Sequence, residues 1–338
     1  MKRILFYSSV NSLELFKTQK FYQIDISILK DLGYDVLLSN RIFDSLLFWK
    51  YDILFSYFYR CSFFAALLAK CFGKKTYFTG GIDSLDSDYA SAFNYKIQAL
   101  FFKLCYWVAD SCIIVSQSDL KNIFKVSSLK KKLSYSEHVI NTKLFIADVP
   151  KEKIFTSIVW MGDEGNVVRK GVDKALQIFA ELKKIPEFVD YRFVIIGRKG
   201  EGEVLVRSII DKYNLKGSVE LKGEVSEEDK INLLKQSKYY FQLSLYEGFG
   251  LAALEALCAN NIIIHSGKGG LANPIYKEQL LFDIDNDFDS ELLKLVNKLA
   301  CFTPITSYDN LLEYYDIQRR KDDFEAIIVN GKSNYKLK

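Results

Sequence analysis

The chain contains few of the residues that build metal centres or disulfide frameworks. Its 338 residues include six cysteines, two histidines and four prolines. The cysteines form no C-x-x-C pair and stand mostly among apolar neighbours, which is typical of reduced cysteines in a hydrophobic core. We therefore expect no zinc site and no disulfide scaffold.

Long apolar runs are also absent. No run of about 18 uncharged apolar residues occurs, so the sequence predicts no transmembrane helix. Residues Met1 to Tyr7 resemble a first strand rather than a signal peptide, because the apolar run is too short and no small-residue cleavage site follows it. We expect a cytoplasmic protein.

The net charge is only +4, and it is unevenly distributed. The first 150 residues carry 19 Lys or Arg against 13 Asp or Glu, and part of this excess lies in Lys121, Lys125, Lys130, Lys131 and Lys132. A solvated surface explains such a cluster. The alternative is contact with an anionic membrane surface or a diphosphate-linked acceptor, because a clustered lysine gains roughly 1 kcal/mol near acidic lipid. No nucleic-acid-binding module is recognisable, so we expect no nucleic acid partner.

A predicted helix from Ala92 to Ala109 adds Lys96 and Lys103 to the same half, among several aromatic residues. Core packing explains these aromatic residues as well as a membrane does. Peripheral docking on the inner membrane face is therefore a second expectation for the localisation.

Apolar runs that resemble strands alternate with helix-forming runs, which is typical of parallel βαβ units. The predicted strands are Arg3 to Ser8, Asp35 to Ser39, Asp52 to Tyr57, Lys75 to Thr79, Ser111 to Ser116, Phe155 to Met161, Arg192 to Gly197, Val219 to Lys222, Tyr239 to Leu245 and Asn261 to His265. The segment Asn141 to Glu152 interrupts the alternation and is the predicted linker. We expect an α/β protein with two doubly wound Rossmann-like domains, residues 1–148 and 149–306, and an interdomain cleft. A charged helix is predicted from Ser307 to Val329.

The stretch Tyr246 to Glu255 carries the most specific signal of the sequence. It follows an apolar run that predicts a buried strand, and it opens a helix-forming run. Gly248 and Gly250 let the backbone approach a ligand closely, and the unpaired N–H groups of a helix N-terminus favour an anion. The carboxylates of Glu247 and Glu255 suit the hydroxyls of a sugar or ribose. The residue types therefore predict a sugar nucleotide as the ligand.

Glu247 and Glu255, with Gly-Phe-Gly between them, resemble the paired-glutamate motif of the retaining glycosyltransferases of family four, which have the two-domain GT-B fold. A strand–turn–helix joint with chance glutamates is the alternative interpretation. Weaker matches follow in the family's order at Ala109 to Ser116, Asn141 to Phe145, Lys170-Gly171, Val194 to Gly197, Leu221 to Val225 and Ile262 to Leu271. The resemblance implies a GT-B fold for most of the chain, with residues 307–338 crossing back to the first domain.

Lys170 is predicted to begin a helix that runs to Lys184. A cation is unfavourable at a helix N-terminus, whereas a diphosphate nearby would reverse the sign of this effect. The resemblance implies the same role, because the family uses this lysine to neutralise the donor diphosphate as the nucleotide leaves. The donor-binding residues that it implies are Arg169, Lys170, Arg198, Val225, Glu247, Gly248, Phe249, Gly250, Leu251 and Glu255. Arg169 and Arg198 are candidates to replace a family arginine that is missing after Gly162.

Two further family features are missing from the first half. The loop after the first strand, Ser8 to Ser12, lacks a glycine pair, and the segment Thr79 to Asp83 lacks a histidine. Asp83 is our candidate for the polar group that faces the reacting sugar, with a turn or N-cap aspartate as the alternative. The predicted catalytic residues are therefore Glu247, Lys170 and Asp83. Two D-x-D sequences occur, but this short spacing arises often by chance, and we expect no metal site.

The resemblance implies a metal-independent, retaining glycosyltransferase of the hexosyltransferase type. It would move a sugar from a nucleotide-diphosphate sugar to a glycan or polyprenyl-linked acceptor, in the synthesis of a cell-surface polysaccharide or glycoconjugate. We expect no cofactor, and a UDP-sugar rather than a GDP-sugar as donor. Two alternatives stay open. One is a GT-B protein that binds a sugar nucleotide without transfer, which the missing features motivate, and the other is a sugar-nucleotide epimerase of the same fold.

Overall fold

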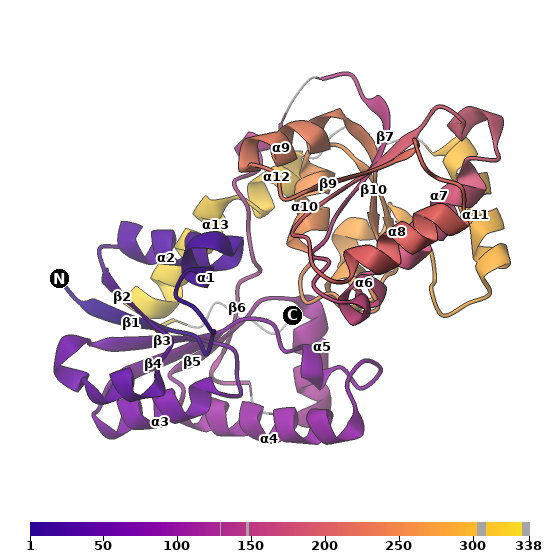
Figure 1. Cartoon of the computed structure of the whole chain (residues 1–338). Coiled ribbons are helices and arrows are strands. Elements are labelled where there is room, and N and C mark those ends of the chain that lie inside the picture. Colours follow the sequence, from indigo (N-terminus) through magenta and orange to yellow (C-terminus); the bar gives the residue numbers. More distant parts are fainter. Residues whose placement is uncertain (129, 147–148, 303–308, 333–338) are drawn as a thin grey trace. The chain divides into compact units, whose positions relative to one another are not determined.

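The computed structural model describes residues 1–128, 130–146, 149–302 and 309–332 (Figure 1). The chain forms two compact units, which are described separately below. Unit 1 consists of Met1–Ile140 and Tyr314–Lys338, and unit 2 consists of Asn141–Glu313. The chain thus changes units after Ile140 and after Glu313, whereas the sequence placed these changes after residues 148 and 306.

Unit 1 is built on a six-stranded parallel sheet with the order β2-β1-β3-β4-β5-β6. The strands are β1 (Arg3–Tyr7), β2 (Asp35–Ser39), β3 (Ile53–Tyr57), β4 (Lys75–Thr79), β5 (Ser111–Ile114) and β6 (Leu133–Tyr135). The helices are α1 (Leu15–Thr18), α2 (Lys20–Asp31), α3 (Ser62–Cys71), α4 (Ala92–Val108), α5 (Gln117–Val126), α13 (Ile317–Phe324) and the π-helix η8 (Glu325–Val329). Short 3₁₀ turns are η1 (Ile42–Leu46), η2 (Phe48–Lys50) and η3 (Asp83–Leu85).

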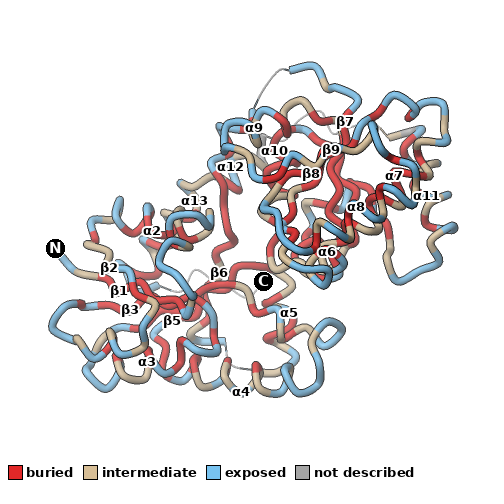
Figure 2. Tube along the Cα trace, in the orientation of Figure 1, coloured by how far each residue is buried: buried red, intermediate tan, exposed pale blue. Residues whose placement is uncertain are grey.

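Two hydrophobic clusters cover the two faces of this sheet. Leu54 and Phe78 pack on one face with Phe102 of α4, and Phe55 packs on the other with Phe324 of α13. Parallel strands that are covered on both faces have continuous apolar sequences, which is why the sequence located them. Figure 2 shows the inner strands of each sheet as the buried centre of its unit.

Unit 2 has a second six-stranded parallel sheet, with the order β12-β11-β10-β7-β8-β9. The strands are β7 (Glu152–Ile158), β8 (Arg192–Ile196), β9 (Val219–Gly223), β10 (Ser237–Gln242), β11 (Ile262–His265) and β12 (Leu280–Leu281). The helices are α6 (Glu164–Arg169), α7 (Val172–Leu182), α8 (Glu203–Lys212), α9 (Glu227–Gln236), α10 (Leu251–Cys258), α11 (Phe288–Cys301) and α12 (Asp309–Tyr314), which ends at the border of unit 1. The 3₁₀ turns are η4 (Thr142–Leu144), η5 (Pro186–Phe188), η6 (Gly269–Ala272) and η7 (Pro274–Tyr276).

The strand order of unit 2 reverses beside β7. After β7 the chain builds β8 and β9 on one side, and it then returns to place β10 on the other side of β7. The loops that follow β7 and β10 therefore leave the carboxyl edge of the sheet in opposite directions. In open α/β sheets, ligands bind at such a switch point. The predicted α/β class with two doubly wound units is confirmed.

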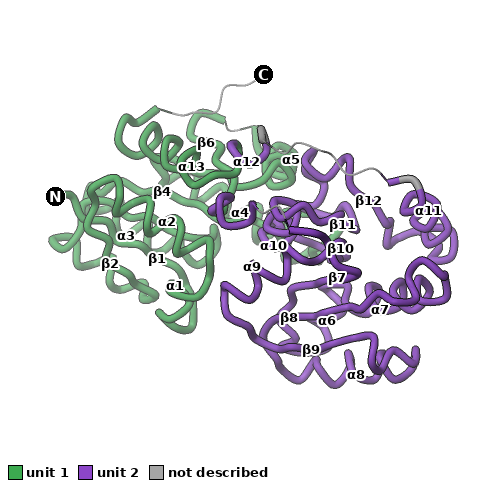
Figure 3. Tube along the Cα trace, turned by 90° about the horizontal axis from the view of Figure 1, so that it is seen from above, with its two compact units in different colours: residues 1–140, 314–338 green, residues 141–313 purple. Residues whose placement is uncertain are grey.

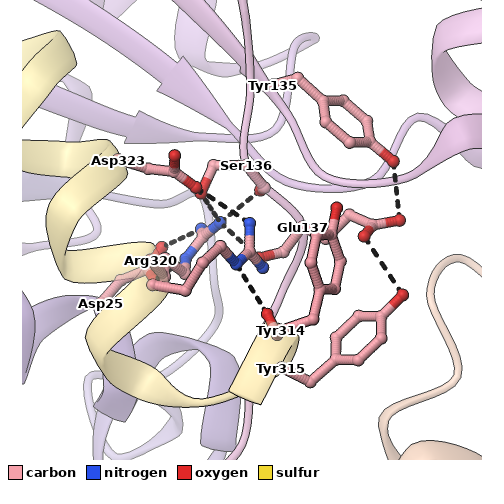
Figure 4. A network of polar contacts seen from close by, with 9 residues as sticks. Asp25, Tyr135, Ser136, Glu137, Tyr314, Tyr315, Arg320 and Asp323 are labelled. Atoms are coloured by element: carbon pink, nitrogen blue, oxygen red, sulfur yellow. Dashed lines mark hydrogen bonds and ion pairs between the residues drawn. The ribbon is translucent and has the colours of Figure 1, made fainter. Parts of the chain in front are cut away.

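The described part of the C-terminal segment belongs to unit 1, as Figure 3 shows for residues 314–332. A buried polar network attaches it there (Figure 4). Arg320 of α13 is completely buried, and its Nε and Nη2 donate to Asp25 Oδ1 and Oδ2 at 2.6 and 2.7 Å. Its Nη1 donates to the carbonyl oxygen of Glu137 at 3.2 Å, and the hydroxyl of Tyr315 donates to Glu137 Oε2 at 3.2 Å. The segment from residue 309 to Val329 is α12, α13 and a π-helix rather than the one helix predicted.

Residues 307 and 308 of that predicted helix lie outside the described residues. Within the described part of the chain, no helix has both the length and the apolar character that a membrane-spanning helix needs.

Candidate functional site

Lys170 lies at a corner between two helices of unit 2. It is the C-cap of α6, and α7 begins at Val172 after Gly171, whose φ of 69° is left-handed. A Cβ atom at Gly171 would lie 2.0 Å from the carbonyl oxygen of Leu243, so only glycine fits there. The prediction that Lys170 begins a helix is wrong. It ends a short helix, where the macrodipole favours a cation.

This corner is held against the segment that follows β10. The backbone N–H of Leu245 donates to the carbonyl oxygen of Arg169 at 2.8 Å. Lys170 Nζ lies 2.8 Å from Glu247 Oε2, and the two side chains are 22% and 15% exposed. The structure therefore brings together two predicted site residues that are 77 positions apart, at the switch point of the sheet.

Glu247 keeps its orientation through two further hydrogen bonds. Gln242 Nε2 donates to Glu247 Oε2 at 3.1 Å, and the hydroxyl of Ser244 donates to the same oxygen at 3.2 Å. These donors lie at the end of β10 and just after it, so the strand itself supports the carboxylate. One acceptor oxygen thus collects a cation and two neutral donors.

The turn that holds Glu247 depends on close backbone contacts. Gly250 is the left-handed N-cap of α10, with a φ of 88° and no side-chain cap, so side chains leave the N–H groups of this helix end available. The N–H of Gly270 donates to the carbonyl oxygen of Glu247 at 2.6 Å. A Cβ atom at Gly269 would lie 2.2 Å from that same oxygen. The loop after β11 therefore packs directly against the Glu247 turn.

Gly248, Phe249 and Leu251 complete this turn at the beginning of α10. Phe249 is buried, whereas Gly248 and Leu251 are half-buried. A Cβ atom at Gly270 would lie 2.6 Å from the Cα of Phe249, so the backbone of η6 packs tightly against this turn.

Glu255 lies one turn into α10 and is 5% exposed. Lys230 Nζ, from α9, donates to both of its carboxylate oxygens at 2.8 and 2.7 Å. Lys230 also lies 3.0 Å from Glu227 Oε1. Sequence reasoning missed Lys230, although a cation in the first turn of a helix is the same signal that singled out Lys170.

The other predicted donor residues follow neighbouring strands of unit 2. Arg169 Nη2 donates to Asn166 Oδ1 at 2.6 Å. Arg198 is exposed and follows Gly197 at the end of β8, and its side chain forms no ion pair with the described residues. Val225 is half-buried after β9, against a cluster that includes Leu233. These residues share the carboxyl edge with Lys170, but no contact joins them to Glu247 within the described residues.

Asp83 belongs to unit 1, where it is exposed at the beginning of η3, shortly after β4. Asp119 lies behind it and is completely buried. Asp119 Oδ1 accepts from the N–H of Ile82 at 3.3 Å, and its Oδ2 has no hydrogen-bond partner. Burial, and then the charge of Asp83, raises the pKa of Asp119 to about 8. Sequence reasoning missed Asp119, whose position three residues after the N-cap Ser116 indicates only a capping role.

Neither histidine is placed as a base. Burial lowers the pKa of His265 to about 4. Burial, and then the charges of Arg320 and Arg319, hold the pKa of His138 well below its ordinary value. Both imidazoles are therefore neutral near pH 7. In the part of the chain that the structure describes, no group of three or more His, Cys, Asp or Glu side chains could hold a metal ion.

Sequence comparison matches part of the chain to a family model and to several relatives. Residues 165–299 match the family model described as Glycosyl transferases group 1. GDP-mannose:cellobiosyl-diphosphopolyprenol alpha-mannosyltransferase of Xanthomonas oryzae is 32% identical over 163 residues, which cover 42% of this chain and 40% of that protein. One subunit of the phosphatidylinositol N-acetylglucosaminyltransferase of Homo sapiens is 30% identical over 105 residues, which cover 31% of this chain and 21% of that protein. The matches span less than half of these relatives.

Solved structures resemble the whole chain. Anabaena HepE in complex with UDP and glucose has a TM-score of 0.73 at 11% identity, and the match covers 98% of this chain and 100% of that one. Sucrose-phosphate synthase of Thermosynechococcus elongatus has a TM-score of 0.66 at 16% identity, with 98% and 97% covered. At such identities the likeness concerns the fold, and it confirms the predicted GT-B fold.

Proposed function

The chain belongs to the glycosyl transferases group 1 family through residues 165–299, and on this premise we propose that it transfers a sugar from a nucleotide-diphosphate donor to a glycan or lipid-linked acceptor. The observation that carries the proposal is the contact between Lys170 and Glu247 at the switch point of unit 2. One relative is named for a diphosphopolyprenol substrate and another for phosphatidylinositol, which favours a lipid-linked acceptor.

Lys170 would neutralise the diphosphate of the donor. In the structure its ammonium group is paired with Glu247. When a diphosphate binds beside the N-terminus of α10, the ammonium group can turn toward it and form charge-assisted hydrogen bonds. Glu247 would keep its orientation during this exchange, because Gln242 and Ser244 still donate to it. Glu247 would then be available to accept a hydrogen bond from a hydroxyl of the donor sugar.

Glu255 would accept hydrogen bonds from the ribose hydroxyls. A carboxylate offers about four acceptor sites, and Lys230 occupies one on each oxygen. Each oxygen of a carboxylate can accept more than one hydrogen bond, which suits a ribose diol. The same lysine offsets the cost of keeping a carboxylate charged at 5% exposure. The backbone near Val225, at the start of α9, would contact the base.

The chemical step would retain the configuration at the anomeric carbon. The bond between that carbon and the diphosphate oxygen breaks on the same face on which the acceptor hydroxyl attacks. The departing phosphate takes the acceptor proton, so a histidine base is not required. Lys170 and the N–H groups from Gly248 to Leu251 would stabilise the charge that develops on the leaving group. Asp83 of unit 1 would position the sugar. We propose that this step uses no metal and no cofactor.

We also propose a UDP-sugar as the donor, with Arg169 and Arg198 as supplementary cations for the diphosphate. HepE, whose fold is similar, was solved with UDP and glucose, whereas the bacterial relative is named for GDP-mannose. The donor base is therefore the first variable that the assay must scan.

The acceptor would reach the enzyme at an anionic membrane surface, where the product would enter a polysaccharide or glycoconjugate. Phe93, Leu100 and Trp107 stand seven residues apart on one face of α4, and their exposed fractions are 71%, 56% and 70%. Lys96 and Lys103 are exposed on the same helix, also seven apart. An apolar stripe with flanking lysines is typical of a helix that lies in a membrane interface.

A second candidate function is binding of a sugar nucleotide without transfer. The ion pair between Lys170 and Glu247 favours it, because a lysine that stays neutralised cannot stabilise a leaving group. The missing family arginine points the same way. An epimerase of the same fold would also use the donor site, and it would convert the sugar without an acceptor.

The deciding experiment measures release of free nucleotide from UDP-, GDP- and ADP-sugars, with and without a polyprenyl-diphosphate-linked acceptor. A transferase releases nucleotide in proportion to glycosylated acceptor, a binding protein releases none, and an epimerase yields an isomeric sugar without any acceptor. Lys170→Ala should abolish the release. Lys184→Ala is the matched control, because Lys184 is exposed on the same unit and, among the described residues, forms an ion pair only with Glu181.

A further inference from the structure

Unit 1 has a cavity of about 260 Å³ far from its carboxyl edge. Its walls come from the starts of β4 and β5, from the residues that lead into β6, and from the C-terminal π-helix. Because the strands are parallel, these starts define the amino edge of the sheet, opposite the edge that Asp83 and Asp119 occupy. The cavity is therefore separate from the site proposed above.

Positive charge predominates around the cavity. Its lining includes four lysines, Lys75, Lys131, Lys132 and Lys332, and a single carboxylate, Asp110. Asp110 Oδ2 is already engaged, because it accepts from Lys70 Nζ at 2.9 Å and from the N–H of Thr76 at 2.8 Å.

Three of these lysines are not compensated. Lys132 Nζ is directed to the end of α4, where it donates to the carbonyl oxygens of Tyr106 and Trp107 at 3.2 and 2.9 Å. The side chains of Lys75, Lys131 and Lys332 are exposed and form no ion pair with the described residues. Like charges that converge on one concave surface raise the local concentration of anions.

Neutral donors line the same cavity. Tyr77 is 3% exposed, and its hydroxyl forms no hydrogen bond with the described residues. Burial raises the pKa of Tyr77 to about 12, so the hydroxyl keeps its proton at neutral pH. The hydroxyls of Ser111 and Ser134 lie 2.9 Å apart in the wall. The cavity thus offers the hydroxyl of Tyr77 as a neutral donor beside exposed ammonium groups.

We propose that this cavity is a binding site for a phosphate or diphosphate group, held by Lys75, Lys131 and Lys332 with the hydroxyl of Tyr77. A phosphomonoester carries about −1.5 to −2 charges near pH 7 and three acceptor oxygens, which matches several convergent cations and one neutral donor. A carboxylate would leave most of these cations unbalanced. The group can belong to a free anion or to a lipid headgroup, and the chemistry of recognition is the same.

The test uses the full-length protein and inorganic pyrophosphate, with hydrogen–deuterium exchange as the readout. Pyrophosphate should slow exchange in peptides that cover residues 74–78 and 131–135, which lie in unit 1. The donor site lies mainly in unit 2, so binding there cannot produce this protection. The double variant Lys75→Gln/Lys131→Gln should bind pyrophosphate at this site at least about tenfold more weakly, since each lost charge-assisted hydrogen bond is worth at least that factor. Lys30→Gln, an exposed lysine of α2 outside the cavity, is the control.

A second arm separates the two sources of the phosphate group. Flotation is measured with vesicles of phosphatidylcholine and phosphatidic acid, and with phosphatidylcholine alone. Binding to the acidic vesicles that the double variant loses, beyond any loss in Lys30→Gln, identifies a lipid headgroup. Pyrophosphate protection without any effect of the variant on flotation identifies a free anion. Equal behaviour of wild type and double variant in both arms overturns the proposal, and so does the absence of protection at residues 74–78 and 131–135.

Discussion

Breaking the buried ion pair of Arg320 and Asp25 should strongly destabilise unit 1. Both side chains are completely buried, and two hydrogen bonds of 2.6 and 2.7 Å join them. Arg320→Met would leave a carboxylate in the interior, with the hydroxyl of Tyr57 as its remaining partner. Removal of one partner from such a pair costs about 3 to 5 kcal/mol. The lost hydrogen bond to the carbonyl oxygen of Glu137 adds to this cost.

Adding Asp25→Asn to the Arg320→Met variant separates the effect of the unpaired charge from the effect of the lost packing. The amide keeps the size of the side chain but removes its charge, so the double variant contains no unpaired buried ion. We expect the double variant to lose at least about 2 kcal/mol less than the sum of the two single losses, because contacting charges couple strongly. Lys17→Met in unit 1 is the control. Its partner Glu14 lies 2.9 Å away with both side chains about two thirds exposed, and we expect a loss of about 1 kcal/mol or less.

Urea denaturation followed by tryptophan fluorescence provides the assay. Trp49 and Trp107 lie in unit 1 and Trp160 lies in unit 2, so a Trp160→Phe background restricts the signal to unit 1. This restriction matters because the two units can unfold in separate transitions. If the single losses add to the double loss within about 0.5 kcal/mol, the two residues are not coupled and the reasoning fails.

Three predictions address the proposed function. Lys170→Ala should lower turnover about 10²-fold or more with the fold intact, and turnover within about threefold of wild type would contradict its assignment. Glu255→Gln should raise the donor KM more than it lowers kcat, whereas Glu247→Gln should do the reverse, and identical kinetic effects would refute the division of roles. The protein should sediment with anionic but not with neutral liposomes at low ionic strength, and equal binding to both, or none, would favour an acceptor away from the membrane.

The apolar sequence of the strands made most of the fold predictable. β2 and β4 begin and end where the sequence placed them, because each has a short apolar or aromatic centre, Val36–Leu38 and Tyr77–Phe78, between polar residues. β12, with two residues, and β6, with three, were missed because so short a run has no readable period. β10 ends at Gln242, three residues before the predicted end, because the backbone of Leu243 and Leu245 contacts the corner at Lys170 instead of continuing the strand.

The residue types of the candidate donor site were predictable, but their arrangement in space was not. The glycine turn and its two glutamates are local features, and their sequence contains all that is needed to recognise them. The pairing of Lys170 with Glu247 depends on the strand order, which no local pattern encodes. α6 was missed because Gly162 to Gly165 resembles a loop, although Asp163 caps that helix by accepting from the N–H of Asn166. Without α6, Lys170 was assigned to the wrong end of a helix.

The pH dependence of stability tests whether the buried carboxyl group of Asp119 is neutral. Its pKa in the folded protein is raised to about 8, first by burial and then by Asp83, from an ordinary value of 3.8. The folded state therefore binds the proton more tightly than the unfolded chain. The stabilisation that this proton provides is complete below about pH 4 and is lost as the pH rises to about 8, by up to about 1.4 kcal/mol per pH unit.

Asp119→Asn cannot ionise, so it should not suffer this loss. The asparagine amide oxygen can still accept from the N–H of Ile82, and its NH₂ group would face Asp83 in place of the Oδ2 that lacks a partner. The variant should therefore become progressively more stable than wild type as the pH rises from about 5 to about 8. Above about pH 8 the difference in their free energies of unfolding should stay constant. Urea denaturation at each pH measures this difference. Asp88→Asn, at an exposed aspartate of the same unit, is the control. A difference that stays constant across this range would mean that Asp119 is already ionised at pH 5, and that Asp83 faces a charge rather than a neutral acid.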